Sequence, residues 1–307
     1  MIVYQPNKNF LKDIRHLAKS WTMTKIVRSV LLVGVYSAAV CIPLEYFGLV
    51  EGILLNPSIF SLLGVVLSIL LVFRTNSAYD RWWEGRKQWG ALVNNCRNMA
   101  ITTHATFNKE NLADRHQMAV YISNFCIAFK EHLRGGVKTE ELIFLSEEDK
   151  KTYANKSHIP NHISYQIHQL VQDAYKRGEI TGEDHLNFKP QLQSLLDILG
   201  ACERIKKTPI PFSYAVYIKI FIVAYTLVMP FALDSTFHLM TIPLTMFVFF
   251  AFIGIELMAE EIEDPFGLDC NDLPTGTIAH TIKENVFEIL EAKKGHLEQN
   301  EVYQKIF

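Results

Sequence analysis

The residues best suited to chemistry form an acidic segment, EEIEDPFGLDCNDLP, at positions 260 to 274. The segment holds six carboxylates and no Lys or Arg, and only Ala259 separates it from the apolar run TIPLTMFVFFAFIGIELM. Pro265 and Gly267 favour a turn over continued helix. Such a turn can gather several carboxylates around one point, and hard cations such as Ca²⁺ take oxygen ligands from loops of this kind. The candidate calcium ligands are Glu261, Asp264, Asp269 and Asp272. The alternative is a solvated acidic face that caps the following helix.

Four apolar stretches must position this segment. They run from about 26 to 49, 59 to 73, 212 to 233 and 237 to 258. A helix of about 20 residues crosses a bilayer, and the second stretch reaches that length if the helix continues through Tyr79. With 49% hydrophobic residues, the composition fits a membrane protein with a water-exposed part. A soluble helical bundle is the alternative. The net charge of −2 does not favour a nucleic-acid partner.

The placement of basic residues predicts the orientation in the membrane. No Lys or Arg lies between Arg28 and Arg74, or between Lys219 and Lys283. These gaps cover the two expected outside loops, near 49–58 and 234–237. Lys and Arg are instead concentrated in the N-terminal arm, at the end of the second stretch and before the third. The positive-inside rule therefore places both termini and the middle of the chain in the cytoplasm.

The remaining segments predict helices and no convincing strand. LADRHQMAVYISNFCIAFKEHLRGG reads as an amphipathic helix that ends at Gly135, and Ser146 with Asp149 resembles a capping box. Further helices are expected up to Gly178 and over about 183–205. The predicted fold is all-α, one unit over 1–307. It contains two membrane helices in 26–84, a cytosolic helical region in 85–210, two more membrane helices in 211–259, and an acidic turn with a C-terminal cytosolic helix in 260–307.

The second apolar stretch carries a regular stripe. Val65, Ile69 and Phe73 recur every four residues and share one helix face. If copies of this helix surround a symmetry axis, the stripe forms a narrow apolar ring that gates by dewetting. The alternative is a lipid-facing surface with a packing seam.

Four histidines between the second and third stretches are the candidates for an enzyme. They are His158, His162, His168 and His185. A His-x3-His spacing can ligate zinc from one helix face, but Pro160 separates His158 from His162. The motifs HExxH and GxSxG and a P-loop are absent from the sequence. The sequence therefore does not favour an enzyme.

Two motifs and their order resemble the bestrophin family of ion channels, in its compact bacterial branch. RWW at 81–83 follows a polar helix end, and EDPFGLDCNDLP resembles the Pro-Phe-Gly motif of the family with its acidic cluster. The order of two spans, a helical cytosolic block, two spans and an acidic turn also matches. The resemblance covers about 20–290. The run of consecutive acids seen in animal members is broken here by Leu268, Cys270 and Asn271.

The resemblance implies a homopentamer around one axial pore in the inner (plasma) membrane. Its apolar neck falls on Val65, Ile69 and Phe73; a register shifted by one residue would place Leu62, Val66 and Leu70 there instead. A second, cytosolic constriction resembles Ile180 in KRGEITGED. The alternative for Ile180 is packing beneath a neighbouring helix.

The expected function is conduction of monovalent ions, tilted toward the cations Na⁺ and K⁺. A chloride or other anion channel of the same family, or a non-conducting membrane scaffold, are the alternatives. The expected partners are four further copies of the chain, membrane lipid and the permeant ions, with no nucleic acid. No cofactor is expected to be required, and Ca²⁺ at the acidic turn is the one candidate ligand.

Overall fold

Helices make up the regular structure of the described chain. The computed structural model describes residues 21–48, 57–269 and 271–293. No strand occurs in these ranges, which confirms the all-α prediction. In chain order the elements are α2 (Trp21–Tyr46), α3 (Pro57–Thr106), α4 (Leu112–Arg134), η2 (Thr139–Glu141), α5 (Glu147–Ala154), α6 (Ile159–Lys176), α7 (Gly182–Lys207), α8 (Phe212–Phe237), η3 (His238–Met240), α9 (Thr241–Glu263) and α10 (Thr275–Ile289).

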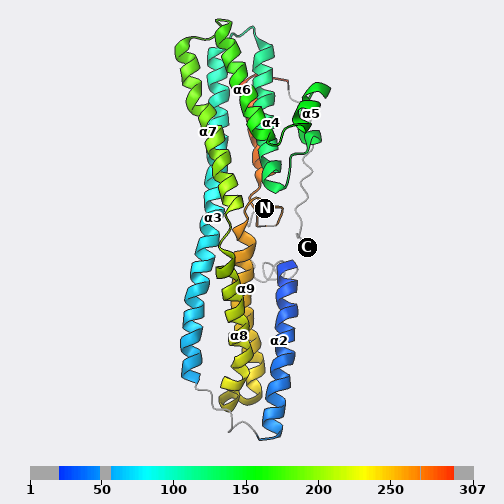
Figure 1. Ribbon diagram of the computed structural model, residues 1–307, viewed down its shortest axis with the longest axis vertical. Helices are drawn as coiled ribbons and strands as arrows, with labels where there is room; N and C mark the ends of the chain where they lie inside the picture. The colour runs from blue at the N-terminus through cyan, green and yellow to red at the C-terminus, as the bar shows by residue number, and fades with distance from the viewer. Residues whose placement is uncertain (1–20, 49–56, 270, 294–307) are drawn as a thin grey trace, which may run out of the picture.

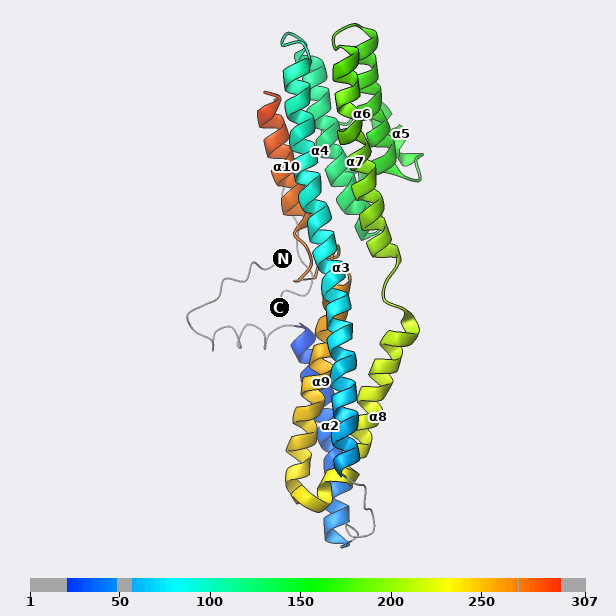
Figure 2. The same ribbon diagram turned by 90° about the vertical axis from the view of Figure 1, so that its left-hand side faces the viewer.

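The helices form an elongated molecule with two halves (Figure 1). The apolar half consists of α2, α8, α9 and the first part of α3. The other half consists of the rest of α3 with α4, α5, α6, α7 and α10 (Figure 2). Each half has a core of its own, because the buried side chains form two separate clusters. We call the larger cluster, which includes Trp89, Phe125 and Phe188, the main core.

The apolar half contains four helices, which lie in three stretches that are long and apolar enough to cross a membrane. Three stretches qualify, over Thr22–Tyr46, Ser58–Thr106 and Phe212–Glu263. The third contains two passes, because α8 and α9 lie side by side and the chain turns back at η3. The four predicted stretches are therefore helical. The basic arm around 8–19 and most of the outside loop near 49–58 lie outside the described residues.

One helix joins the two halves. α3 runs without interruption for 50 residues, a length of about 75 Å at 1.5 Å per residue. The expected division at residue 84 therefore falls inside a continuous helix.

Local signals set the helix ends in the half that contains α4 to α7. Gly135 follows α4 with a φ of 134°, in a region that glycine tolerates best. Ser146 and Asp149 form both hydrogen bonds of the predicted capping box at the start of α5. His158 caps α6, with Pro160 in the first turn, where its missing N–H costs little. The predicted helix end at Gly135 and the predicted capping box are therefore confirmed, whereas α6 begins three residues before the expected start at His162.

Candidate functional site

The apolar stripe of α3 lies on an open face of the described chain. The exposed fractions are 54% for Val65, 52% for Ile69 and 61% for Phe73. In the alternative register, Leu70 packs against the core of the apolar half. The stripe beginning at Val65 is therefore the one in which all three side chains point away from that core.

The opposite face of α3 holds the helix in place. Leu67 and Leu71 are fully buried and pack with α8 residues in the core of the apolar half. Gly64 permits a close approach there, because a Cβ atom at this position would lie 2.9 Å from the Tyr225 hydroxyl. That hydroxyl donates a hydrogen bond to the Phe60 carbonyl at 3.2 Å. These contacts fix the direction of the exposed stripe.

Arg74 lies one residue beyond the stripe but points into the protein. It is 1% exposed, and its guanidinium contacts the carboxylate of Glu256 at 3.5 Å and that of Glu263 at 2.7 Å. Arg74 is therefore neutralised inside the chain and adds no positive charge to the open face. This pairing was not expected from the sequence. A signal for it exists, because Glu256 is the one acid within the apolar run of α9 and an acid there indicates a buried partner.

The RWW segment anchors the middle of α3 to three neighbouring segments. The Arg81 guanidinium donates to the carbonyl oxygens of Ile205 and Thr208 at 2.5 Å each, and to that of Glu263 at 3.0 Å. The Trp82 indole donates to the Asn271 carbonyl at 3.0 Å. The motif thus ties α3 to the end of α7, the end of α9 and the acidic segment.

The turn after α9 packs directly on α3. Phe266 is fully buried, and a Cβ atom at Gly85 would lie 3.1 Å from its ring. Arg134 donates to the Phe266 carbonyl at 3.2 Å and to the Thr275 hydroxyl at 2.9 Å. The Pro-Phe-Gly turn is therefore held between α3 and the end of α4.

The four predicted calcium ligands do not all converge. Glu261 accepts hydrogen bonds from Thr22 and Asn271, and Asp264 pairs with Lys206. Asp269 and Asp272 do lie together, because the Asp269 N–H donates to an Asp272 oxygen at 2.6 Å. Among the described residues, these four form no group with three ligand atoms within 4.8 Å. The expectation that all four gather around one point is thus corrected to a pair.

Asp272 is the most perturbed acid of this turn. Its side chain is 2% exposed, and its Oδ1 atom has no hydrogen-bond partner in the described structure. Burial raises the pKa of Asp272 to about 7; the hydrogen bond from Asp269 opposes this, while the charges of Asp269, Asp264 and Glu261 add to it. The turn therefore favours a proton or a cation at this carboxylate.

Ile180 is buried and is not on an open face. Its side chain is 4% exposed and belongs to the main core. A side chain inside the core of one chain does not line a passage between chains. The cytosolic-constriction interpretation of Ile180 is therefore corrected to the packing alternative.

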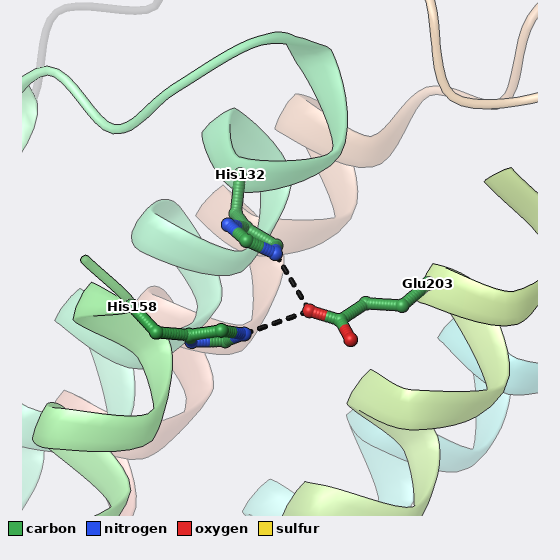
Figure 3. A group of neighbouring side chains, drawn as sticks. All are labelled: His132, His158 and Glu203. Carbon is green, nitrogen blue, oxygen red and sulfur yellow. Dashed lines mark hydrogen bonds and ion pairs between the residues drawn. The ribbon is translucent and has the colours of Figure 1, made fainter. Parts of the chain in front are cut away.

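The candidate histidines separate, and one joins a cluster that the sequence did not indicate. His162 packs against Tyr153, His185 stacks on Tyr175, and His168 contacts the Ser164 carbonyl. His158 instead lies beside His132, and both rings contact Glu203 (Figure 3). The three residues come from different segments, so a search for ligands spaced along one helix does not find them.

Comparisons with known proteins agree on one family. A family model described as "Bacterial/Fungal Bestrophin protein" matches residues 1–288. "Voltage-dependent anion channel-forming protein sll1024" of Synechocystis is 35% identical over 238 residues, 76% of this chain and 77% of its own. The "Voltage-dependent anion channel-forming protein YneE" of Escherichia coli K12 is 28% identical over 289 residues, 94% of each chain.

The fold has a close counterpart among solved structures. A bacterial bestrophin homologue from Klebsiella pneumoniae superposes with a TM-score of 0.82 at 27% identity. The match covers 88% of this chain and all of that one.

Proposed function

The chain belongs to the bacterial and fungal bestrophin family of ion channels, and from this premise we propose that it assembles as a homopentamer around an axial pore that passes monovalent ions. The chain is an ion channel of this family, not an enzyme. Val65, Ile69 and Phe73 form the pore neck. The position of a second, cytosolic constriction is unassigned, since Ile180 is buried.

The open stripe of α3 carries this proposal. Three apolar side chains, each more than half exposed, lie on one face of a helix whose other face is packed. Five copies of such a face around an axis give a narrow apolar passage that empties of water easily and binds no ion tightly. The neck then controls whether ions pass and leaves charge selection to other residues.

Asp80 is the residue on this face that we assign to charge selection, in favour of Na⁺ and K⁺. It lies seven residues after Phe73 and therefore points within about 20° of the same direction on the helix. Its side chain is exposed, whereas the nearby Arg74 is buried and paired. A ring of carboxylates at this level concentrates cations. Anion conduction is the second candidate, because the relatives described above are named as anion channel-forming proteins.

The substitution Asp80→Asn tests the assignment. We expect the reversal potential in a KCl gradient across a planar bilayer to move from near the K⁺ equilibrium potential toward that of Cl⁻, because the five carboxylates are lost. Glu147→Gln is the control, since Glu147 is 82% exposed on the short helix α5, away from α3. A wild-type reversal potential near that of Cl⁻ would reject the cation preference and support the anion channel.

Purified protein in planar bilayers and liposomes tests the function as a whole. The pentamer is expected in detergent by light scattering, together with ion flux after reconstitution. A monomer, or a pentamer without flux under any applied voltage, would favour the non-conducting scaffold.

The inner membrane is the proposed location, with both termini in the cytoplasm. The support is the absence of Lys and Arg between Arg28 and Arg74 and between Lys219 and Lys283, combined with the positive-inside rule. Accessibility of single cysteines introduced at exposed positions of α5 and η3 to a membrane-impermeant reagent would test the orientation.

No cofactor is required for this function, and we propose Asp269 and Asp272 as the part of the acidic turn that binds Ca²⁺. Glu261 and Asp264 have the other contacts described above. The buried Asp272 oxygen without a hydrogen-bond partner supports a cation there, because hard cations take carboxylate oxygens.

The pH dependence of stability tests this carboxylate. The folded-state pKa of Asp272, about 7, lies above its ordinary value of 3.8. The folded protein therefore holds the proton more tightly, and this stabilisation is lost as the pH rises from about 4 through 7. Between pH 5 and 8 we expect a loss of about 3 kcal/mol in calcium-free buffer, read as a lower melting temperature.

Calcium should reverse the loss at pH 8, because it replaces the proton at the ionised carboxylate. Asp272→Asn should flatten the pH profile and remove the calcium effect. A calcium effect that persists in Asp269→Ala/Asp272→Ala would place the calcium site elsewhere.

A further inference from the structure

The strongest cluster outside the proposed pore consists of His132, His158 and Glu203. His132 lies in the last turns of α4, His158 caps α6, and Glu203 lies near the end of α7. We propose that this cluster binds one transition-metal ion of the Zn²⁺ type. This metal site does not depend on conduction and has no catalytic role in the proposal.

The three ligand atoms already converge. The Nε2 atoms of His132 and His158 lie 2.6 Å and 2.7 Å from the same Oε1 atom of Glu203, and Figure 3 shows both rings directed at that atom. Zinc takes His nitrogen and carboxylate oxygen at about 2.0–2.2 Å in tetrahedral sites, so ligand atoms there stand about 3.3–3.5 Å apart. The side chains need to separate by less than about 1 Å to admit the ion.

The charge of the cluster favours a divalent cation. Glu203 places a carboxylate between two imidazoles, with both Nε2 atoms at one of its oxygens. Lys207 lies 3.7 Å from the other carboxylate oxygen with a side chain 69% exposed, so it can move away when a cation binds.

An ion can reach the cluster from solvent. The side chains are 22%, 27% and 20% exposed for His132, His158 and Glu203. A surface cavity of about 660 Å³ is lined by His158 and Glu203. With three protein ligands, the fourth tetrahedral position is left for water.

Metal binding must displace hydrogen bonds that exist without it. The Nδ1 atom of His158 accepts the Asn161 N–H at 3.3 Å, so the ring proton lies on Nε2 and is donated to Glu203. A metal on Nε2 requires the proton on Nδ1, and the hydrogen bond to Asn161 is then lost. At 3.3 Å this bond is longer than the two contacts that the histidines make with Glu203. In the alternative role, Glu203 only makes hydrogen bonds with the two histidines, and the bond between His158 and Asn161 is kept.

Equilibrium dialysis of the untagged, chelator-treated protein against ZnCl₂ separates the two roles. We expect one zinc ion per chain at this site. Glu203→Gln, which keeps the shape and a hydrogen-bonding carbonyl, should raise the dissociation constant by at least about 100-fold, as should His132→Gln with His158→Gln, because even residues outside the ligand shell are worth 10–100-fold. His162→Gln with His168→Gln is the matched control in α6 and should bind zinc like the wild type.

A Co²⁺ spectrum identifies the coordination. The wild type should show intense visible bands of a four-coordinate ion, and Glu203→Gln should lose them while its circular dichroism and pentamer peak stay unchanged. Equal zinc binding by the wild type and Glu203→Gln, or none by the wild type, would overturn the proposal.

Discussion

Phe73→Ala is expected to raise the open probability and the macroscopic current of the reconstituted channel by at least about tenfold. Phe73 is 61% exposed on the α3 stripe, so five rings meet in the proposed neck. The cost of wetting a narrow passage grows with its apolar surface. Removing five rings lowers that cost, and about 1.4 kcal/mol suffices for a tenfold change. Single-channel recordings at fixed voltage measure the effect.

The control for this variant is Phe247→Ala. Phe247 lies on α9 with 67% exposure, so the chemical change and the degree of exposure match, while the residue lies on another helix. We expect wild-type currents from it. Equal currents from Phe73→Ala and the wild type would remove Phe73 from the neck, and increased currents from both would point to a general loosening of the membrane helices.

Arg74→Met is expected to destabilise the protein by about 3–5 kcal/mol, because it leaves a buried charge without its partner. Glu256 is fully buried and contacts Arg74. Glu263 also contacts Arg74, but it still accepts the Ile210 N–H at 2.7 Å in the absence of the guanidinium. The yield of pentamer and its melting temperature in detergent measure the loss.

A second variant distinguishes a charge effect from a packing effect. Arg74→Met with Glu256→Gln neutralises the buried acid and should recover most of the lost melting temperature. Lys219→Met is the exposed control: Lys219 contacts Glu260 at 2.8 Å with side chains 40% and 51% exposed, and such pairs contribute less than about 1 kcal/mol. If the double variant is as unstable as Arg74→Met, lost packing and not the unpaired Glu256 explains the effect.

The features predicted correctly from the sequence are those with local signals. The membrane helices follow from runs of apolar residues, and the ends of α4 and α5 follow from Gly135 and the Ser146–Asp149 capping box. The neck role of the α3 stripe stays a prediction, and the structure adds that its three side chains are exposed. Each of these signals lies within about 20 consecutive residues.

The features that the sequence analysis missed depend on contacts between distant segments. Arg74 and Glu256 are 182 positions apart, and no spacing rule relates them. His132, His158 and Glu203 come from three helices whose packing decides their meeting. Ile180 looked exposed because its neighbours are polar, but its burial depends on how the turn folds onto the main core. A four-carboxylate site was expected from composition, whereas Lys206 and Thr22 pair with two of its members.

The unbroken course of α3 restricts how the proposed neck widens. Arg81 lies at the midpoint of α3 and is held by three carbonyl oxygens. The helix has no internal proline, so it has no bend point of that kind. We therefore treat α3 as a rigid rod that is fixed at Arg81. Each arm is about 37 Å long. A tilt of about 5° about Arg81 displaces the two ends by about 3 Å in opposite directions. The end of α3 that carries the proposed neck therefore moves outward only when the other end moves inward.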